Sequence, residues 1–407
     1  MRRSWGVSYK GVDIARVLSI PLYGKILSNI YKAIFQFDEI EVKDINSEVL
    51  IVYTHKRSKR EDYFEIIESL CEILKETSLA LVVTIPKRSI QDKVRLFKHF
   101  ISSLGLIRTL EGGIAQKCYK ILLIARVKVN IDQVSQFLDK AEFKVLVTFC
   151  DAYDLDNILT QYARKIGKTT VTLQHGQYSL SKVDIPENMA LNNLASDYLC
   201  AWGHATHSEF SKVNNHITTI LPLGPLRFLN ERIEPFSEQN ICSSESKQII
   251  CVMLNADNCL RINLKMIELA THHCKQTLTK YCVRFHPKNN NARYLPHFGS
   301  EYVGEYNDSK ASVIRFSIIY TSGVMIELLM RGELFFLFQN DETPELFRRD
   351  LLGFSTVSEL TERVSSLFSN KEVSATKLNA LRDYFVNTTN VKKGYYDFFK
   401  NDLLADE

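Results

Sequence analysis

Short apolar runs alternate with amphipathic stretches along most of the chain. Apolar runs rich in β-branched residues are typical of buried strands, whereas apolar residues spaced three or four apart are typical of helices. In the first part of the chain this pattern predicts strands at 49–53, 79–85, 121–124, 144–149, 169–173, 198–202 and 218–221, and helices at 63–74, 94–104, 134–141 and 154–166. Strands that alternate with helices of this length predict parallel sheets with helices on both faces.

The alternation stops around residues 231–247, which are polar and show little periodicity. It then restarts with predicted strands at 249–254, 281–285, 313–320 and 334–338, helices at 262–273 and 324–330, and a helical tail over 357–399. A chain of 407 residues is too long for one ordinary core. We therefore predict an α/β protein with two Rossmann-like domains, 1–235 and 248–407, joined by a linker at 236–247.

One predicted strand of the second domain ends in groups suited to an anion. The run Arg284-Phe285-His286-Pro287-Lys288 follows apolar residues 281–283, and the proline stops the strand there. In open α/β sheets, ligands bind at the carboxyl edge of the strands. Arg284, His286 and Lys288 therefore predict an anion site at this edge.

A second strand end in the same domain supports a phosphate site. Residues 318–320 lead into Thr321, Ser322 and Gly323, and a helical pattern begins directly afterwards. Hydroxyl groups and the free N–H groups of a helix N-terminus suit a phosphate. Glu327 lies five residues past the serine, where we expect a role on ribose hydroxyls or a first-turn complement to the helix dipole.

Candidate chemistry in the first domain also follows predicted strands. His175 precedes Gly176 at the end of the strand at 169–173, where a sharp turn would expose the imidazole as a base or hydrogen-bond donor. Asp151 ends the strand at 144–149 and is either a carboxylate facing the same cleft or a helix N-cap. Gly203 follows a third strand and allows either close approach of a ligand or a plain turn, and Arg227 is a candidate anion contact.

Composition narrows the class of protein. Hydrophobic content of 45%, charged content of 24% and a net charge of +4 are typical of a soluble globular protein. No stretch interleaves basic and aromatic residues in an RNA-binding pattern, so we expect no nucleic-acid partner. The nine cysteines lack a Cys-x-x-Cys pair, and Cys150, Cys200, Cys251 and Cys282 lie in apolar runs, as core residues in a reducing cytoplasm do.

The N-terminus is basic, with Arg2 and Arg3, but charged residues and a proline interrupt the apolar pattern at 17–35. This excludes a signal peptide or membrane span of the usual kind. The segment is either a basic amphipathic helix on an anionic membrane surface or a helix packed on its own domain. The sequence also lacks the G-x-G-x-x-G, Walker A, G-x-S-x-G and H-E-x-x-H motifs and any metal-ligand spacing, so no metal or bound cofactor is expected.

Taken in order, these motifs resemble those of a group of bacterial surface-polysaccharide glycosyltransferases. The motifs are Gln-His-Gly (174–176), Trp-Gly (202–203), Leu-Gly-Pro (223–225), Arg-x-His-Pro (284–287) and Thr-Ser-Gly (321–323) with Glu327. The group includes capsule-type Kdo transferases, sialyl- and polysialyltransferases, and the CDP-glycerol glycerophosphotransferases of teichoic acid synthesis. The resemblance spans roughly residues 151–340 and lies in the order and spacing of short motifs.

The resemblance implies a GT-B fold, in which the parallel sheets of two Rossmann-like domains face a central cleft. It implies an N-terminal acceptor domain and a C-terminal nucleotide-donor domain. The donor nucleotide would be bound by Arg284, His286, Pro287, Lys288, Thr321, Ser322, Gly323 and Glu327. His175, or Asp151 as in the sialyltransferase-like members, would be the catalytic base, and the acceptor side of the cleft would contain Gln174, Gly176, Tyr178, Gly203 and Arg227.

The predicted function is transfer of a sugar (Kdo, sialic acid or a related nonulosonate) from a CMP-activated donor to a hydroxyl of a surface glycan, such as capsule or lipopolysaccharide. The sequence has Gln-His-Gly-Gln-Tyr where teichoic acid relatives usually have Trp-His-Gly-Thr-Pro, and it lacks the acidic-acidic-Gly motif of the sialyltransferase-like members. Two alternatives stay open: an alditol-phosphate transferase using CDP-glycerol or CDP-ribitol, and a non-catalytic nucleotide-sugar-binding partner. The expected location is the cytoplasm, with peripheral contact to the inner face of the plasma membrane as an open alternative.

Overall fold

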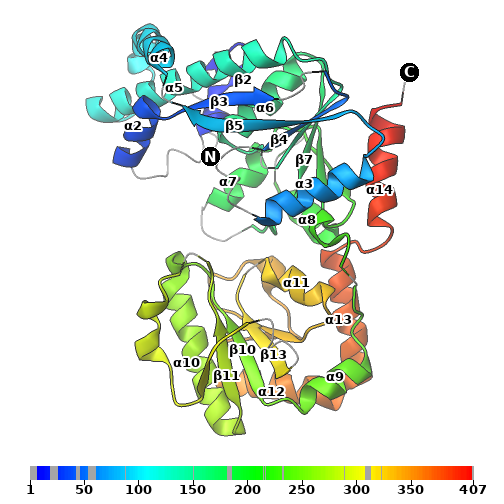
Figure 1. Cartoon of the computed structure of the whole chain (residues 1–407). Helices are drawn as coiled ribbons and strands as arrows, with labels where there is room; N and C mark the ends of the chain where they lie inside the picture. The colour runs from blue at the N-terminus through cyan, green and yellow to red at the C-terminus, as the bar shows by residue number, and fades with distance from the viewer. Residues whose placement is uncertain are drawn as a thin grey trace. The chain divides into compact units, whose positions relative to one another are not determined.

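The chain forms two compact units (Figure 1). The first comprises residues 1–178, 184–229 and 389–407, and the second comprises 179–183 and 230–388. The computed structural model describes residues 7–18, 26–42, 46–53, 61–87, 89–149, 151–180, 186–213, 215, 217–231, 233–287, 289–307, 313–321 and 323–405.

The first unit is built on a sheet with the strand order β3-β5-β4-β6-β7-β8-β9. The edge strand β3 pairs antiparallel with β5, and the other pairs are parallel. The strands are β3 (Phe37–Val42), β4 (Val49–Tyr53), β5 (Leu79–Lys87), β6 (Val145–Thr148), β7 (Thr169–Leu173), β8 (Tyr198–Ala201) and β9 (Thr219–Pro222), and a small hairpin of β1 (Ser8–Tyr9) and β2 (Val12–Asp13) precedes them. Apart from β3 and this hairpin, the unit shows the parallel arrangement that alternating strands and helices predict.

Helices cover both faces of this sheet (Figure 1). Along β4, Leu50 and Val52 join the core on one face, whereas Val49 and Ile51 join the core on the other. The helices and short turns of the unit are α1 (Ile14–Leu18), α2 (Ile26–Phe35), α3 (Glu61–Ile73), α4 (Ile90–Ser103), η2 (Leu104–Arg108), α5 (Ile114–Leu138), α6 (Asp154–Lys165), α7 (Pro186–Asn193), α8 (His204–Phe210), η3 (Leu226–Phe228), α14 (Val391–Asp397) and the π-helical turn η9 (Phe398–Leu403). A strand with both faces buried needs apolar residues at every position, as β4 has.

The second unit has a fully parallel sheet with the order β12-β11-β10-β13-β14-β15. Its strands are β10 (Ile249–Met253), β11 (Lys280–Arg284), β12 (Tyr302–Glu305), β13 (Ile314–Ile319), β14 (Phe335–Phe338) and β15 (Gly353–Phe354). Its helices and turns are α9 (Glu238–Glu245), η4 (Asp257–Cys259), α10 (Leu260–Thr277), η5 (Asn291–Arg293), η6 (Leu295–His297), α11 (Val324–Met330), η8 (Glu345–Phe347), α12 (Val357–Ser369) and α13 (Lys371–Phe385). Cys251 and Cys282 are buried on neighbouring strands, and Cys200 is buried in the first unit, which confirms them as core residues; Cys150 lies outside the described residues.

The strand predicted at 121–124 is wrong. These residues lie inside α5, and the helix predicted at 134–141 is largely the end of the same helix. Ile121 and Ile124 are fully buried in the core between α5 and the sheet. A short apolar run in a buried helix has the same composition as a buried strand, so its periodicity does not separate the two.

The linker predicted at 236–247 is also wrong, because α9 occupies most of it and belongs to the second unit. The Ser237 side chain caps this helix by accepting a hydrogen bond from the Asn240 N–H at 3.2 Å. Ile241 is fully buried, and the backbone of Phe236 forms two hydrogen bonds with the Asn379 side chain. The polar helix is therefore packed on the second unit, which a linker interpretation overlooks.

The second domain was predicted to extend to residue 407, which is wrong. It ends at residue 388, and residues 389–407 belong to the first unit. Tyr395 and Phe399 are buried in the core that contains Ile51 and Val147. The Tyr395 hydroxyl also donates to the Gly224 carbonyl at 3.1 Å. The end of the chain therefore completes the core of the unit in which the chain begins.

We expect Phe399→Ala to destabilise the first unit by about 3–5 kcal/mol, because it leaves a cavity in a closed core. Trp202 is buried in the first unit, so tryptophan fluorescence in urea reports its unfolding. Tyr396→Ala is the matched control, since Tyr396 is 39% exposed on α14, directly before the turn that contains Phe399. Equal stability of the two variants would contradict the packing of this segment on the first unit.

Candidate active site

The second unit has its topological switch point between β10 and β13. If the strands of this unit are numbered in chain order, their order in the sheet is 3-2-1-4-5-6. The strand order therefore reverses between strands 1 and 4, which are β10 and β13. Ligands of open parallel sheets bind outside the carboxyl ends of the strands at this point. Thr321 follows β13, and Leu254–Asp257 follow β10, so both segments border it.

An ion pair joins the two motifs predicted for the donor site. Arg284 ends β11, Glu327 lies in α11, and the Arg284 Nη1 and Glu327 Oε2 atoms are 3.2 Å apart. Glu327 is largely buried, whereas the Arg284 side chain is 38% exposed. The pair links the end of β11 to α11, the helix that follows the Thr-Ser-Gly motif. The Glu327 carboxylate, for which we expected a role on ribose hydroxyls or at the helix dipole, forms an ion pair with Arg284 here.

The loop after β10 lies against the loop after β11. The Leu254 N–H donates to the Arg284 carbonyl at 2.9 Å, and the Asn289 Nδ2 group donates to the Asn255 carbonyl at 3.0 Å. Asn263, fully buried in α10, holds the Asn255 backbone with two further hydrogen bonds. Asn255 Nδ2 and Asn289 Oδ1 are buried without a hydrogen-bond partner among the described residues. One unsatisfied donor and one acceptor therefore remain at this strand edge, where a ligand could satisfy them.

The other predicted donor residues lie on the same edge. His286 and Thr321 are half-buried, and Pro287 and Gly323 are exposed. A Cβ added at Gly323 would meet open space. Lys288 and Ser322 lie outside the described residues. Because α11 has only seven residues, we assign its N-terminus no separate binding role.

A hollow of about 1090 Å³ lies elsewhere in the second unit, along α10. Its walls include Lys265, Glu268 and His272 on that helix and residues 296–299 and 340–342. None of the described residues predicted for the donor site lines it. We place the candidate site at the switch point instead, because the ionisable side chains and the unsatisfied amides converge there.

In the first unit, His175 reaches from the end of β7 to the end of β6. Its Nδ1 atom lies 2.6 Å from the Phe149 carbonyl oxygen, and its ring packs edge-on against Tyr63 at a centroid distance of 5.2 Å. A carbonyl only accepts hydrogen bonds, so Nδ1 carries the proton and the neutral ring has its lone pair on Nε2. This tautomer is the one that a general base requires.

Gln174 fixes the turn that carries His175. Its Oε1 atom accepts hydrogen bonds from the Trp202 N–H at 2.7 Å and the Thr206 hydroxyl at 2.9 Å, and its Nε2 group donates to the Gly176 carbonyl at 2.9 Å. The Trp202 indole N–H in turn donates to the Gln174 carbonyl at 3.0 Å. Gln174 is 2% exposed. It was predicted at the acceptor side of the cleft, but these contacts give it a positioning role that joins the ends of β7 and β8.

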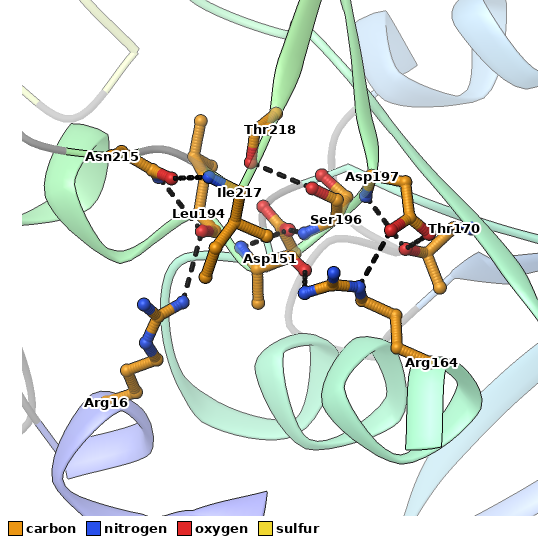
Figure 2. Close-up of polar contacts among 11 residues, drawn as sticks. Arg16, Asp151, Arg164, Thr170, Leu194, Ser196, Asp197, Asn215, Ile217 and Thr218 are labelled. Carbon is orange, nitrogen blue, oxygen red and sulfur yellow. Dashed lines mark hydrogen bonds and ion pairs between the residues drawn. The ribbon is translucent and has the colours of Figure 1, made fainter. Parts of the chain in front are cut away.

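Asp151 is fully buried, and its carboxylate accepts hydrogen bonds from the backbone N–H groups of Ala195 (2.7 Å) and Ser196. Figure 2 shows this carboxylate against the segment between α7 and β8. The same segment is held by Arg16, which donates to the Leu194 carbonyl at 3.3 Å, and by Arg164, which contacts the Ala195 carbonyl at 3.1 Å and the Asp197 carboxylate at 2.8 Å. Burial raises the pKa of Asp151 to about 6, although the hydrogen bonds from Ser196 and Ala195 oppose the shift.

The two candidate bases have different surroundings. Asp151 would have to leave two backbone N–H groups to reach an acceptor hydroxyl, whereas the His175 ring already presents the required tautomer. Sequence reasoning missed Tyr63, Asn255 and Asn289, which adjoin the predicted motifs in space but lie outside them in sequence. The only signal in the sequence is their position. Asn255 and Asn289 follow strand ends, and Tyr63 lies in the helix after a strand.

The remaining predicted residues lie nearby with different surroundings. Tyr178 is largely buried and its ring lies edge-on to His175 at 6.4 Å, and a Cβ added at Gly176 would meet open space. Gly203 is buried and precedes α8. Arg227, a predicted anion contact, instead pairs with Glu65 at 3.1 Å. The residues that the structure describes contain no group of His, Cys, Asp and Glu suited to a metal ion and no helix able to cross a membrane.

No protein-family model matches the sequence, and no curated protein matches it. Solved structures share its fold. A Listeria monocytogenes protein proposed to be a UDP-N-acetylglucosamine 2-epimerase gives a TM-score of 0.53 at 10% identity, over 89% of this chain and 98% of that chain. The S. aureus MnaA structure with UDP gives 0.53 at 11% identity, again over 89% and 98%. A trehalose-6-phosphate synthase, OtsA, gives 0.49 at 10% identity, over 89% and 100%.

At such low identity the first two likenesses show the fold alone. The fold is of the GT-B class, and the prediction of an α/β protein with two Rossmann-like domains is confirmed.

The pKa of Asp151 generates a test of its structural role. Because the pKa is about 6 in the folded chain and ordinarily 3.8, the native state binds more protons between these values. Its contribution to stability is therefore largest below pH 3.8 and is lost as the pH rises through 6. Asp151→Asn removes this titration, so from pH 4 to pH 7 the variant should gain about 2 kcal/mol relative to the wild type. Urea unfolding followed by tryptophan fluorescence measures the difference, and parallel stability curves would contradict the buried, shifted carboxylate.

Proposed function

We propose that the chain is a glycosyltransferase that moves a nonulosonate sugar from a CMP-activated donor to a hydroxyl of a bacterial surface glycan. The observation that carries the proposal is the edge of the second unit. There the Arg284–Glu327 pair brings two anion-suited motifs together at a topological switch point, beside the unsatisfied amides of Asn255 and Asn289. A GT-B fold and the order of the short motifs support the same reading.

On the donor side, His286 and Thr321 would bind the nucleotide. Lys288 and Ser322 follow them directly in sequence and would add a cation and a hydroxyl. These groups would stabilise the negative charge that develops on the leaving nucleotide phosphate, which is the electrostatic part of catalysis. Arg284 would act through its position, because its guanidinium already pairs with Glu327. No metal needs to be invoked if the protein's own cations hold that phosphate.

On the acceptor side, His175 would take the proton of the attacking hydroxyl. Its support is the hydrogen bond from Nδ1 to the Phe149 carbonyl, which leaves Nε2 as the proton-accepting nitrogen. Water must be kept away from the reacting groups, because hydrolysis of the donor competes with transfer.

The burial of Asp151 favours a second candidate, an alditol-phosphate transferase using CDP-glycerol or CDP-ribitol. In the sialyltransferase-like relatives the base is acidic, and Asp151, its nearest match, is bonded to backbone N–H groups here. In the teichoic acid relatives the base is the histidine of the motif that His175 matches. A phosphodiester product would identify the second candidate, and a glycoside the first.

Nucleotide binding is the first test. A ligand present at 100 times its Kd stabilises the native state by about 2.7 kcal/mol, which for a unit of this size corresponds to a Tm shift of roughly 5–10 °C. We expect CMP or CDP to produce such a shift, and UDP, GDP and ADP to produce less. His286→Ala should abolish it, whereas His297→Ala, an exposed histidine of the same unit, should retain it.

Stabilisation by UDP, the nucleotide found with MnaA, would keep the fold and contradict the cytidine donor. No response to any of the nucleotides would contradict the donor site as a whole. Binding of CMP without turnover of any CMP- or CDP-linked donor would point to a non-catalytic binding partner.

A further inference from the structure

The exposed face of α4 is a continuous apolar stripe. Ile90, Val94, Phe97 and Ile101 follow one another at helical spacing and are 80%, 50%, 66% and 50% exposed. Leu104 continues the line past the helix end at 37%. The opposite face of α4 already packs on the unit, with Leu96 buried against Phe37, Ala125 and Val129. The stripe therefore does not contribute to the packing of this unit. Large exposed apolar patches mark interaction sites.

The neighbouring helix α2 extends the patch. Leu27, Tyr31 and Phe35 lie four residues apart on α2 and are 82%, 51% and 42% exposed. The Lys93 ammonium of α4 lies 5.4 Å from the centroid of the Phe35 ring, so the two helices adjoin there. Figure 1 shows α2 and α4 on the same side of the first unit, at its upper left. We call these exposed apolar side chains of α2 and α4, together with Leu104, the apolar face.

The segments that carry and adjoin the apolar face have an excess of positive charge. Residues 26–35 and 90–120 contain seven lysines and arginines against two acidic residues, whereas the whole chain has 51 against 47. The rest of the chain is therefore close to neutral, and the mild total of +4 conceals a local excess. One of the two acidic residues, Asp92, is buried and pairs with Arg95. Lys93 and Lys98 lie on the two sides of the α4 stripe by helical spacing, and both are exposed.

We propose that the apolar face docks the chain on an anionic lipid bilayer. Exposed Phe, Ile and Leu side chains would enter the boundary between headgroups and acyl chains, while the lysines would contact anionic headgroups. The charge favours this occupant over a second copy of the chain. A two-fold dimer would bring the same patch against itself and place these lysines near one another.

This surface differs from the one that the sequence suggests. Contact of the basic N-terminal segment with the membrane was one of two open alternatives, and residues 1–6 and 19–25 lie outside the described residues. Helix α2 belongs to that segment, but α4 supplies the longer stripe and its two flanking lysines. The proposal does not depend on the proposed function, because none of the candidate site residues lies on α2 or α4.

The test is co-sedimentation of the full chain with vesicles. One set contains phosphatidylcholine alone, and the other contains equal parts of phosphatidylcholine and phosphatidylglycerol. We expect binding to the anionic set, weakened when ionic strength rises from about 0.1 M to about 1 M and the Debye length falls from about 10 Å to about 3 Å. Phe97→Ser combined with Ile101→Ser should weaken binding by roughly tenfold or more. Lys93→Gln combined with Lys98→Gln should weaken it by roughly 25-fold, about fivefold for each lysine.

The matched control is Val373→Ser combined with Lys377→Gln on α13 of the second unit, where Val373 is 53% exposed and Lys377 is exposed. It should bind like the wild type.

All changes are at exposed positions, so unchanged Tm values would show that the variants fold. Equal binding to both vesicle sets, no binding to either, or loss of binding in the control would overturn the proposal. So would a dimer in solution that the Phe97 and Ile101 changes convert to monomer, since a second copy would then occupy the face.

Discussion

Parallel strand pairing is the constraint on which the rest of this structure depends. In a parallel sheet every strand ends at the same edge, so residues far apart in sequence meet wherever strands end. In the second unit this brings Arg284 and Glu327 to 3.2 Å across 43 residues of chain. In the first unit it lets His175, after β7, hydrogen-bond to Phe149 at the end of β6. The helices that fill both faces of each sheet make these edges the places where polar side chains can gather.

Each edge is held by a different kind of buried interaction. In the first unit the amide of Gln174 satisfies two donors and one acceptor, and so fixes the turn that orients His175. In the second unit Asn263 and the Arg284–Glu327 pair fix the loops, but the Asn255 and Asn289 side chains keep unmet hydrogen-bonding capacity. A fully satisfied network rigidifies a site, whereas an unsatisfied group invites a ligand. The difference agrees with the proposed roles, in which the first unit holds a base in position and the second unit binds a nucleotide.

The sequence alone predicts the α/β class and the strand ends that carry the motifs. Short buried strands, and the Gly or Pro residues at which they end, are local signals. The sequence alone is insufficient where long-range packing decides. The apolar run at 121–124 is helical because α5 continues through it, and the last residues join the first unit because Phe399 completes a core built far upstream. Nothing local distinguishes Asp151, which binds backbone N–H groups, from a carboxylate facing a ligand. The local charge around α4 was hidden by a nearly neutral total.

Release of CMP from CMP-linked nonulosonates in the presence of surface-glycan acceptors, compared between the wild type and His175→Gln, tests the proposed reaction. We expect turnover by the wild type and a loss of about 10²–10⁴-fold in the variant, the usual contribution of general base catalysis, with CMP binding unchanged. Full turnover by His175→Gln would contradict the role of His175. Absence of turnover by the wild type with every CMP- and CDP-linked donor would contradict the account as a whole.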